Sequence, residues 1–147
     1  MHASQNGATN VDSLAALWGP RLVRFYFFVC ADKPLAEASA IDTLAEALRS
    51  CRLNPSALLR LAASRAANLR PASPNGDRMS RALLGLPSRQ RLALAFSRGM
   101  GVGVEGAASA MSINIAEVKR LLADGLLGLH RALFEEPDVK LENSSDL

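Results

Sequence analysis

Apolar side chains recur every three or four positions along most of the chain, which is the repeat of one face of an α-helix. The pattern predicts helices over about residues 12–30, 34–51, 56–69, 78–84, 88–98, 104–111 and 115–134. Leucine and alanine supply most of the apolar side chains, and both favour a helix over a strand. We therefore predict an all-α fold.

Proline, glycine and short polar side chains mark the expected ends of these helices. The Gly19-Pro20 pair should interrupt or kink the first helix, because proline removes a backbone hydrogen bond. Asp12 and Ser88 are candidate N-caps, and Pro34 fits the first turn of the second helix. Residues 1 to about 10 are polar and should fray.

The second predicted helix carries an apolar stripe that we expect to face the core. The stripe consists of Leu35, Ala38, Ile41, Ala45 and Leu48. Three acidic residues, Glu37, Asp42 and Glu46, lie off the stripe and should face solvent or a partner. This arrangement predicts an amphipathic helix with large side chains inward and carboxylates outward.

A change of composition divides the chain in two. The segment from Arg70 to Asp77 is rich in proline, glycine, asparagine and serine, and it has no apolar side chain larger than alanine. Such a composition is typical of a linker. We predict two small helical domains, at 11–70 and 78–134, a linker at 71–77 and a disordered acidic tail at 135–147.

Composition and charge narrow the function classes only slightly. Hydrophobic residues make up 49% of the 147 residues, so the chain can bury a core. The net charge is +3, and most of the cations are arginine, which favours phosphate or carboxylate partners. The longest dense apolar run, 25–30, is too short to cross a bilayer, and the first residues do not resemble a signal peptide. We expect a cytoplasmic protein with no membrane partner.

The sequence offers no catalytic or metal-binding constellation. Cys30 and Cys51 are far apart, and His2 and His130 are isolated, so a four-ligand metal site cannot be assembled. There is no glycine-rich phosphate loop with its lysine, and no nucleophile has an evident histidine partner. We expect a protein that is not an enzyme, with no metal or other cofactor and no small-molecule substrate.

Residues 101–122 have the layout of a helix-turn-helix. The first helix of such a unit needs a small side chain where the second helix crosses it, and Ala108 meets that need. Ser112, Ile113 and Asn114 form a compact turn, with Ile113 directed toward the core. The second helix must then bury one side and offer the other to the DNA major groove.

Helical geometry assigns the two sides of this second helix. If Val118 points inward, a rotation of about 100° per residue puts Leu122, Gly125 and Leu129 on the same side. The outward residues are then Ala116, Lys119, Arg120 and Ala123. Lysine and arginine can hold phosphates or guanine edges. An ordinary helical hairpin with a solvated basic face fits the spacing equally well.

The second half of the chain resembles region four of the extracytoplasmic-function sigma factors. Residues 83–92, LLGLPSRQRL, look like the opening of that region, and residues 101–122 match its helix-turn-helix without a gap. The resemblance implies binding to the upstream, minus-thirty-five promoter element. The DNA contacts that it implies are Asn114, Ala116, Glu117, Lys119, Arg120, Arg89 and Arg91.

The first half is similar to sigma region two. Residues 18–25 look like its first helix, 36–44 like the segment that docks on RNA polymerase, and 58–68 like the segment that opens the minus-ten element. The resemblance implies binding to the polymerase core by Glu37, Asp42 and Glu46. It implies a promoter-opening role for Leu58, Arg60, Arg65 and Asn68.

The first half also departs from the family pattern. The family usually carries a tryptophan near Leu58, an acidic residue at Ala38 and a glutamine at Ile41. Strand separation benefits from a side chain that stacks on an unstacked base, and leucine cannot stack. These departures put promoter opening in doubt.

Three functions follow from these observations. The first is a sigma-factor-like initiation protein that binds RNA polymerase core and promoter DNA. The second is a sigma-like decoy or adaptor that binds an anti-sigma factor without opening DNA. Leu121, Leu126 and Leu127 extend the apolar surface of the last helix, either for core packing or as a groove for an anti-sigma helix. The third is a regulator that uses its helix-turn-helix alone on an operator.

Overall fold

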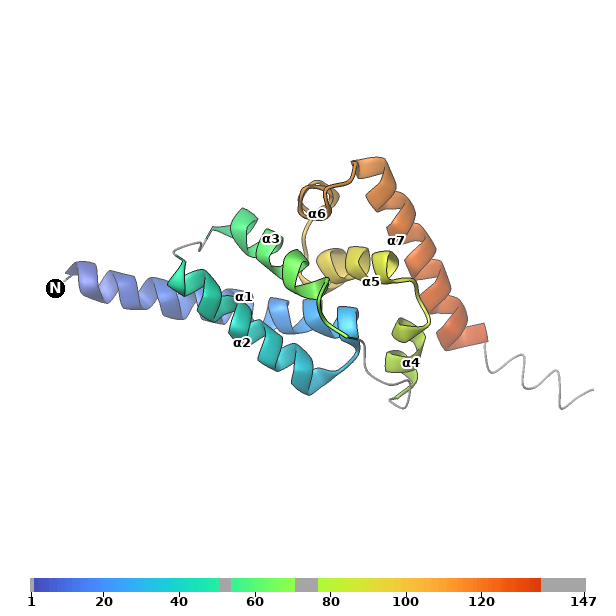
Figure 1. Ribbon diagram of the computed structural model, residues 1–147, viewed down its shortest axis with the longest axis horizontal. Helices are drawn as coiled ribbons and strands as arrows, with labels where there is room; N and C mark the ends of the chain where they lie inside the picture. The colour runs from blue at the N-terminus through green and yellow to red at the C-terminus, as the bar shows by residue number, and fades with distance from the viewer. Residues whose placement is uncertain (1, 51–53, 71–76, 136–147) are drawn as a thin grey trace, which may run out of the picture.

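The computed structural model describes residues 2–50, 54–70 and 77–135, and every element in them is helical (Figure 1). The elements are α1 (His2–Cys30), α2 (Lys33–Arg49), α3 (Pro55–Ala66), α4 (Arg78–Leu84), α5 (Ser88–Leu94), η1 (Ala95–Gly99), α6 (Val104–Met111), α7 (Ile115–His130) and η2 (Arg131–Glu135). The two η elements are π-helical turns that directly continue α5 and α7. Since no strand occurs in the described ranges, the predicted all-α class is confirmed.

Helix α1 is longer than predicted and is not interrupted. It begins at His2, so the predicted fraying and the predicted start near Asp12 were wrong, and it passes through Pro20 without a break. Trp18 and Leu22, one turn apart on either side of the proline, are both buried in the core. Their packing holds the helix together across the one hydrogen bond that proline removes.

Short polar side chains cap several of the helices. Asp32, Asn54, Asp77 and Asn114 each accept a hydrogen bond from a backbone amide in the first turn of the following helix. Ser88 was predicted to cap α5, but it is the first helical residue; Pro87 holds the N-cap position, where no side chain caps the helix. Extended backbone at Pro87 starts this helix instead.

Helix α2 turns its small side chains, rather than its large ones, toward the core. Its buried residues are Ala36, Ser39, Ala40, Thr43 and Ala47. Ile41 is 67% exposed and Leu48 is 40% exposed, so the predicted inward stripe was wrong. Tyr26 of α1 is fully buried, and its hydroxyl group meets that of Thr43 on α2. The small side chains on this face of α2 leave room for the ring.

A buried hydrogen-bond chain fixes the pairing of α1 with α2. The hydroxyl groups of Tyr26 and Thr43 lie 2.5 Å apart, and the Thr43 hydroxyl donates to the Ser39 carbonyl at 2.7 Å. Burial raises the pKa of Tyr26 to about 12. The tyrosine therefore stays neutral, and its buried oxygen has a partner.

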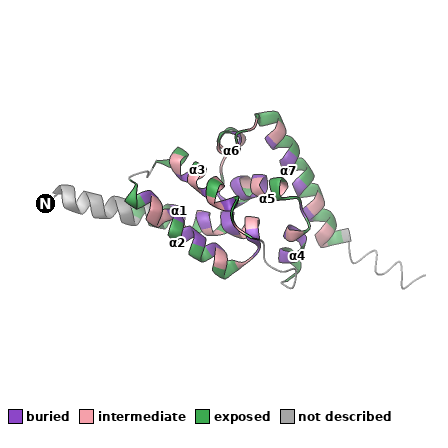
Figure 2. Cartoon of the chain, in the orientation of Figure 1, coloured by how far each residue is buried: buried purple, intermediate pink, exposed green. Residues whose placement is uncertain are grey.

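One hydrophobic core crosses the boundary between the two predicted domains. It combines Trp18, Leu22, Phe25 and Tyr26 of α1 with Phe96, Met100, Ala107 and Val118 of the second half. The rings of Phe25 and Phe96 lie 4.8 Å apart, centroid to centroid. Figure 2 shows the buried positions gathered where the helices of the two halves meet. The two halves share this core in the structure, whereas residues 71–76 of the predicted linker and 136–147 of the predicted tail lie outside the described ranges.

Contacts to the protein backbone also join the first half of the chain to the second half. The Arg24 Nε donates to the Gly99 carbonyl at 3.0 Å, and the Arg91 Nε donates to the Val29 carbonyl at 3.1 Å. A Cβ atom added at Gly99 would lie 2.9 Å from both the nitrogen and the Cα of Phe25. The chain needs glycine at position 99 because η1 presses directly on the backbone of α1.

Candidate nucleic-acid interface

Helices α6 and α7 form a helix-turn-helix unit with the predicted bounds. Ser112 ends α6 in the left-handed conformation, with φ of 58°, and the Ile113 amide donates to the Ala108 carbonyl at 3.0 Å. The Asn114 side chain accepts from the Glu117 amide at 2.8 Å and so starts α7. Ala108 is buried, as expected for a small residue at the helix crossing. The turn is thus fixed at both ends.

The outward face of α7 agrees with the sequence prediction at every position. Ala116, Lys119, Arg120 and Ala123 are all exposed. On the opposite side, Val118, Gly125 and Leu129 are buried, as predicted, whereas Leu122 is half-buried. The inner side is also extended by Leu121, which is only 7% exposed.

The sequence left core packing and a partner surface open for Leu121, and its burial fits core packing. Val118, Leu121 and Gly125 form the buried flank, since α7 lies along α5 and a Cβ at Gly125 would lie 3.1 Å from the Leu94 side chain. Leu126 and Leu127 are exposed, at 37% and 49%, as a partner surface requires. The exposed part of the predicted surface therefore consists of these two leucines.

Three exposed cations lie on α7 and in the first turn of α5. Glu117 pairs with Arg120 at 2.7 Å and with Arg89 at 3.9 Å, and both arginine side chains remain more than half exposed. Lys119 is exposed and has no ion-pair partner within the described part of the chain. Exposed ion pairs are weak, so a phosphate can compete with Glu117. We call Arg89, Lys119 and Arg120 the basic surface.

Arg91 was predicted as a DNA contact, but it is buried. Besides its bond to Val29, its guanidinium donates to the Leu86 carbonyl at 2.5 Å. Burial lowers the pKa of Arg91. Both bonds are made to backbone of the protein itself, so Arg91 ties α5 to α1 and is not available to DNA.

The four residues predicted for promoter opening do not form one surface. Leu58 is fully buried with Ala62 and Ala66 on the inner face of α3, so it is not exposed for the promoter-opening role that the resemblance implies. Arg65 is bonded to Glu46 of α2 at 3.3 Å. Arg60 and Asn68 are exposed.

The acidic residues predicted to bind polymerase lie along α2. Glu37 and Asp42 are exposed, whereas Glu46 is half-buried and engaged by Arg65. The exposed side chain of Ile41 lies directly beside Asp42 in the sequence. The outer face of α2 therefore presents apolar and acidic groups together.

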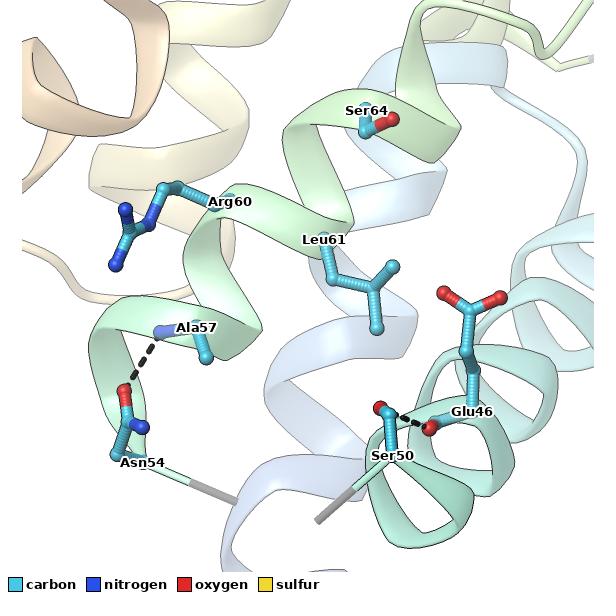
Figure 3. A pocket seen from close by; sticks show the side chains of 7 residues that line it. All are labelled: Glu46, Ser50, Asn54, Ala57, Arg60, Leu61 and Ser64. Atoms are coloured by element: carbon cyan, nitrogen blue, oxygen red, sulfur yellow. Dashed lines mark hydrogen bonds between the residues drawn. The ribbon is translucent and has the colours of Figure 1, made fainter. Parts of the chain in front are cut away.

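A hollow of about 530 Å³ lies between the end of α2 and α3 (Figure 3). Its polar side chains do not converge on one point. Asn54 caps α3, the Ser50 hydroxyl donates to the Glu46 carbonyl at 2.7 Å, and Arg60 points away from the Glu46 carboxylate. The hollow has no geometry for binding a charged ligand.

The described ranges contain neither a candidate metal site nor a candidate membrane-spanning helix. Histidine, cysteine and carboxylate side chains form no group of three that could hold a metal ion there. None of the helices described is long and apolar enough to span a membrane. The basic surface thus remains as the candidate site.

Neither a protein-family model nor a curated protein matches this sequence.

Proposed function

We propose that this protein binds duplex DNA through α6 and α7, as a transcription initiation protein of the sigma-factor type. The observation that carries the proposal is the basic surface on the outer side of a helix whose inner side is buried. In helix-turn-helix proteins this second helix enters the major groove. Lys119 and Arg120 would then contact phosphates or guanine edges, and Arg89 would contact a flanking phosphate.

The outer face of α2 supports a second part of the proposal, binding to RNA polymerase core. An exposed isoleucine with neighbouring carboxylates suits a protein interface that is apolar at its centre and charged at its edge. The polymerase would supply the chemistry, and the protein would act in the cytoplasm. Co-purification with polymerase core, followed by transcription from a mixture of promoters, tests both parts together.

Asp42→Arg is expected to weaken binding to polymerase core by about 1–3 kcal/mol, because it puts a cation against a basic docking surface. Asp42 is exposed, so the variant should fold. Titration of labelled protein with core enzyme measures the effect. Glu105→Arg, an equal charge change at an exposed position of α6, is the matched control and should bind to polymerase core like the native protein. Equal binding by Asp42→Arg and native protein would argue against docking through α2.

A decoy or adaptor is the second candidate function. Its support comes from Leu58, which is fully buried in the shared core, so that α3 cannot offer this side chain to an unstacked base. Such a protein would bind an anti-sigma helix on Leu126 and Leu127 and leave promoter DNA closed.

Substitution of the exposed leucines Leu126 and Leu127 distinguishes the initiation function from the decoy function. If the protein is a decoy, Leu126→Ser/Leu127→Ser should lower its affinity for an anti-sigma factor by at least about tenfold, because exposed apolar anchors dominate such interfaces. Calorimetric titration against a candidate anti-sigma domain gives the affinity. Replacing Lys119 and Arg120 should leave that affinity intact. A decoy is excluded if the leucine variant binds as tightly as the native protein.

A further inference from the structure

Helix α6 has no cation of its own. Its only charged residue is Glu105, in the first turn. The first helix of a helix-turn-helix crosses the DNA backbone, and phosphates there are normally held by lysine, arginine or short polar side chains. Any cation that faces the phosphates beside α6 must therefore come from a neighbouring element.

Helix α6 is covered on two flanks and open on one strip. The core and α7 cover the side that carries Ala107 and Ala108. Helix α3 lies against the other flank. Glu105 and Ser109 are exposed and, four positions apart, lie on one face of α6, and Ser112 at its C-terminal end is exposed as well. DNA that touches α6 must lie on this strip, between α3 and α7 (Figure 1).

Arg60 of α3 stands at the edge of this strip. It lines a hollow of about 170 Å³ between α3 and α6, together with Ser56, Gly106 and Ser109. Arg60 is exposed, and its guanidinium has no ion-pair partner in the described ranges. In Figure 3 its side chain extends away from Glu46, the carboxylate that holds Arg65. Arg60 is thus available on the side of α3 that borders α6.

We infer that Arg60 binds a DNA phosphate beside α6, so that the DNA interface extends from the second half of the chain onto the first. The inference rests on the proposed function of α6 and α7. The hydrophobic core that the two halves share holds α3 against α6 and so places Arg60 beside α6. Arg60 then acts on duplex DNA together with the helix-turn-helix, a different role from the promoter opening predicted from the sequence.

Salt-dependent DNA binding by matched variants tests the inference. The probe is a short fluorescent duplex of mixed sequence, titrated by anisotropy at several potassium chloride concentrations. Arg60→Ala should make the slope of log affinity against log salt less negative by about 0.9 and lower the affinity by roughly fivefold at about 0.1 M salt. Arg60→Lys should keep the native slope, because a phosphate contact needs only the charge. Arg49→Ala, an exposed arginine on α2, controls for net charge.

The variants distinguish this inference from the proposed function. If Arg60→Ala binds like native protein while Lys119→Ala loses affinity, the inference is overturned and the proposed function stands. An equal loss in Arg60→Ala and Arg49→Ala would also overturn the inference, because it reports net charge alone. If native protein shows no salt-sensitive binding, both the proposed function and the inference fail.

Discussion

Replacing Gly99 with alanine is expected to lower the free energy of unfolding by about 1–3 kcal/mol. The added methyl group would lie 2.9 Å from the backbone nitrogen and Cα of Phe25. A backbone cannot move aside as a flexible side chain can, so η1 and α1 must separate. That separation also strains the Phe25–Phe96 contact and the bond from Arg24 to the Gly99 carbonyl. Urea unfolding followed by circular dichroism measures the loss.

Gly19→Ala is the matched control for this substitution. Gly19 lies inside α1, and a Cβ there would meet no atom within 4 Å. Alanine in a helix is favoured over glycine by up to about 1 kcal/mol, so this variant should be as stable as the native protein or slightly more stable. Equal stability of Gly99→Ala and Gly19→Ala would contradict the close packing of η1 on α1. It would favour two halves that fold separately.

Lys119→Ala/Arg120→Ala is expected to abolish most DNA binding while the protein stays folded. Both side chains are exposed, so their removal opens no cavity. Two lost phosphate contacts should make the slope of log affinity against log salt less negative by about 1.8 and lower the affinity by roughly 30-fold at about 0.1 M salt. If one of the pair reads a guanine, the loss of about 1–3 kcal/mol should be confined to one base position.

A second pair of exposed cations controls for the change of net charge. Lys33→Ala/Arg49→Ala removes two positive charges from the ends of α2, away from the helix-turn-helix. This pair should bind duplex DNA nearly as well as native protein. Anisotropy titrations give the affinities, and circular dichroism checks the fold. Similar losses in the two double variants would mean that α7 has no special role.

The sequence predicted the helix-turn-helix well because its signals are local. The periodicity of α7 and the Ser-Ile-Asn turn both act within a few residues of one another, and the outward positions of Lys119 and Arg120 follow from helical rotation alone. The caps at Asn54 and Asn114 are local as well, although the predicted caps were Asp12 and Ser88. Such elements keep their form whatever the rest of the chain does.

The errors of prediction arose where a distant part of the chain decides burial. The inward face of α2 carries Thr43, whose hydroxyl group meets that of Tyr26 in α1, whereas Ile41 and Leu48 are exposed. Arg91 is buried because its guanidinium finds the carbonyl of Val29, which is 62 positions away in the sequence. Periodicity reveals that a helix has two faces, but the packing partner determines which face is inside.

Binding of native protein to labelled duplex DNA, alone and with RNA polymerase core, tests the central proposal most directly. The basic surface predicts salt-sensitive binding, with affinity falling by about 10- to 40-fold between about 0.05 and 0.2 M salt for two or three phosphate contacts. Polymerase core should strengthen binding to promoter fragments over mixed sequence. If neither sample shows salt-sensitive binding, DNA recognition by α7 is contradicted, and the decoy function should replace it.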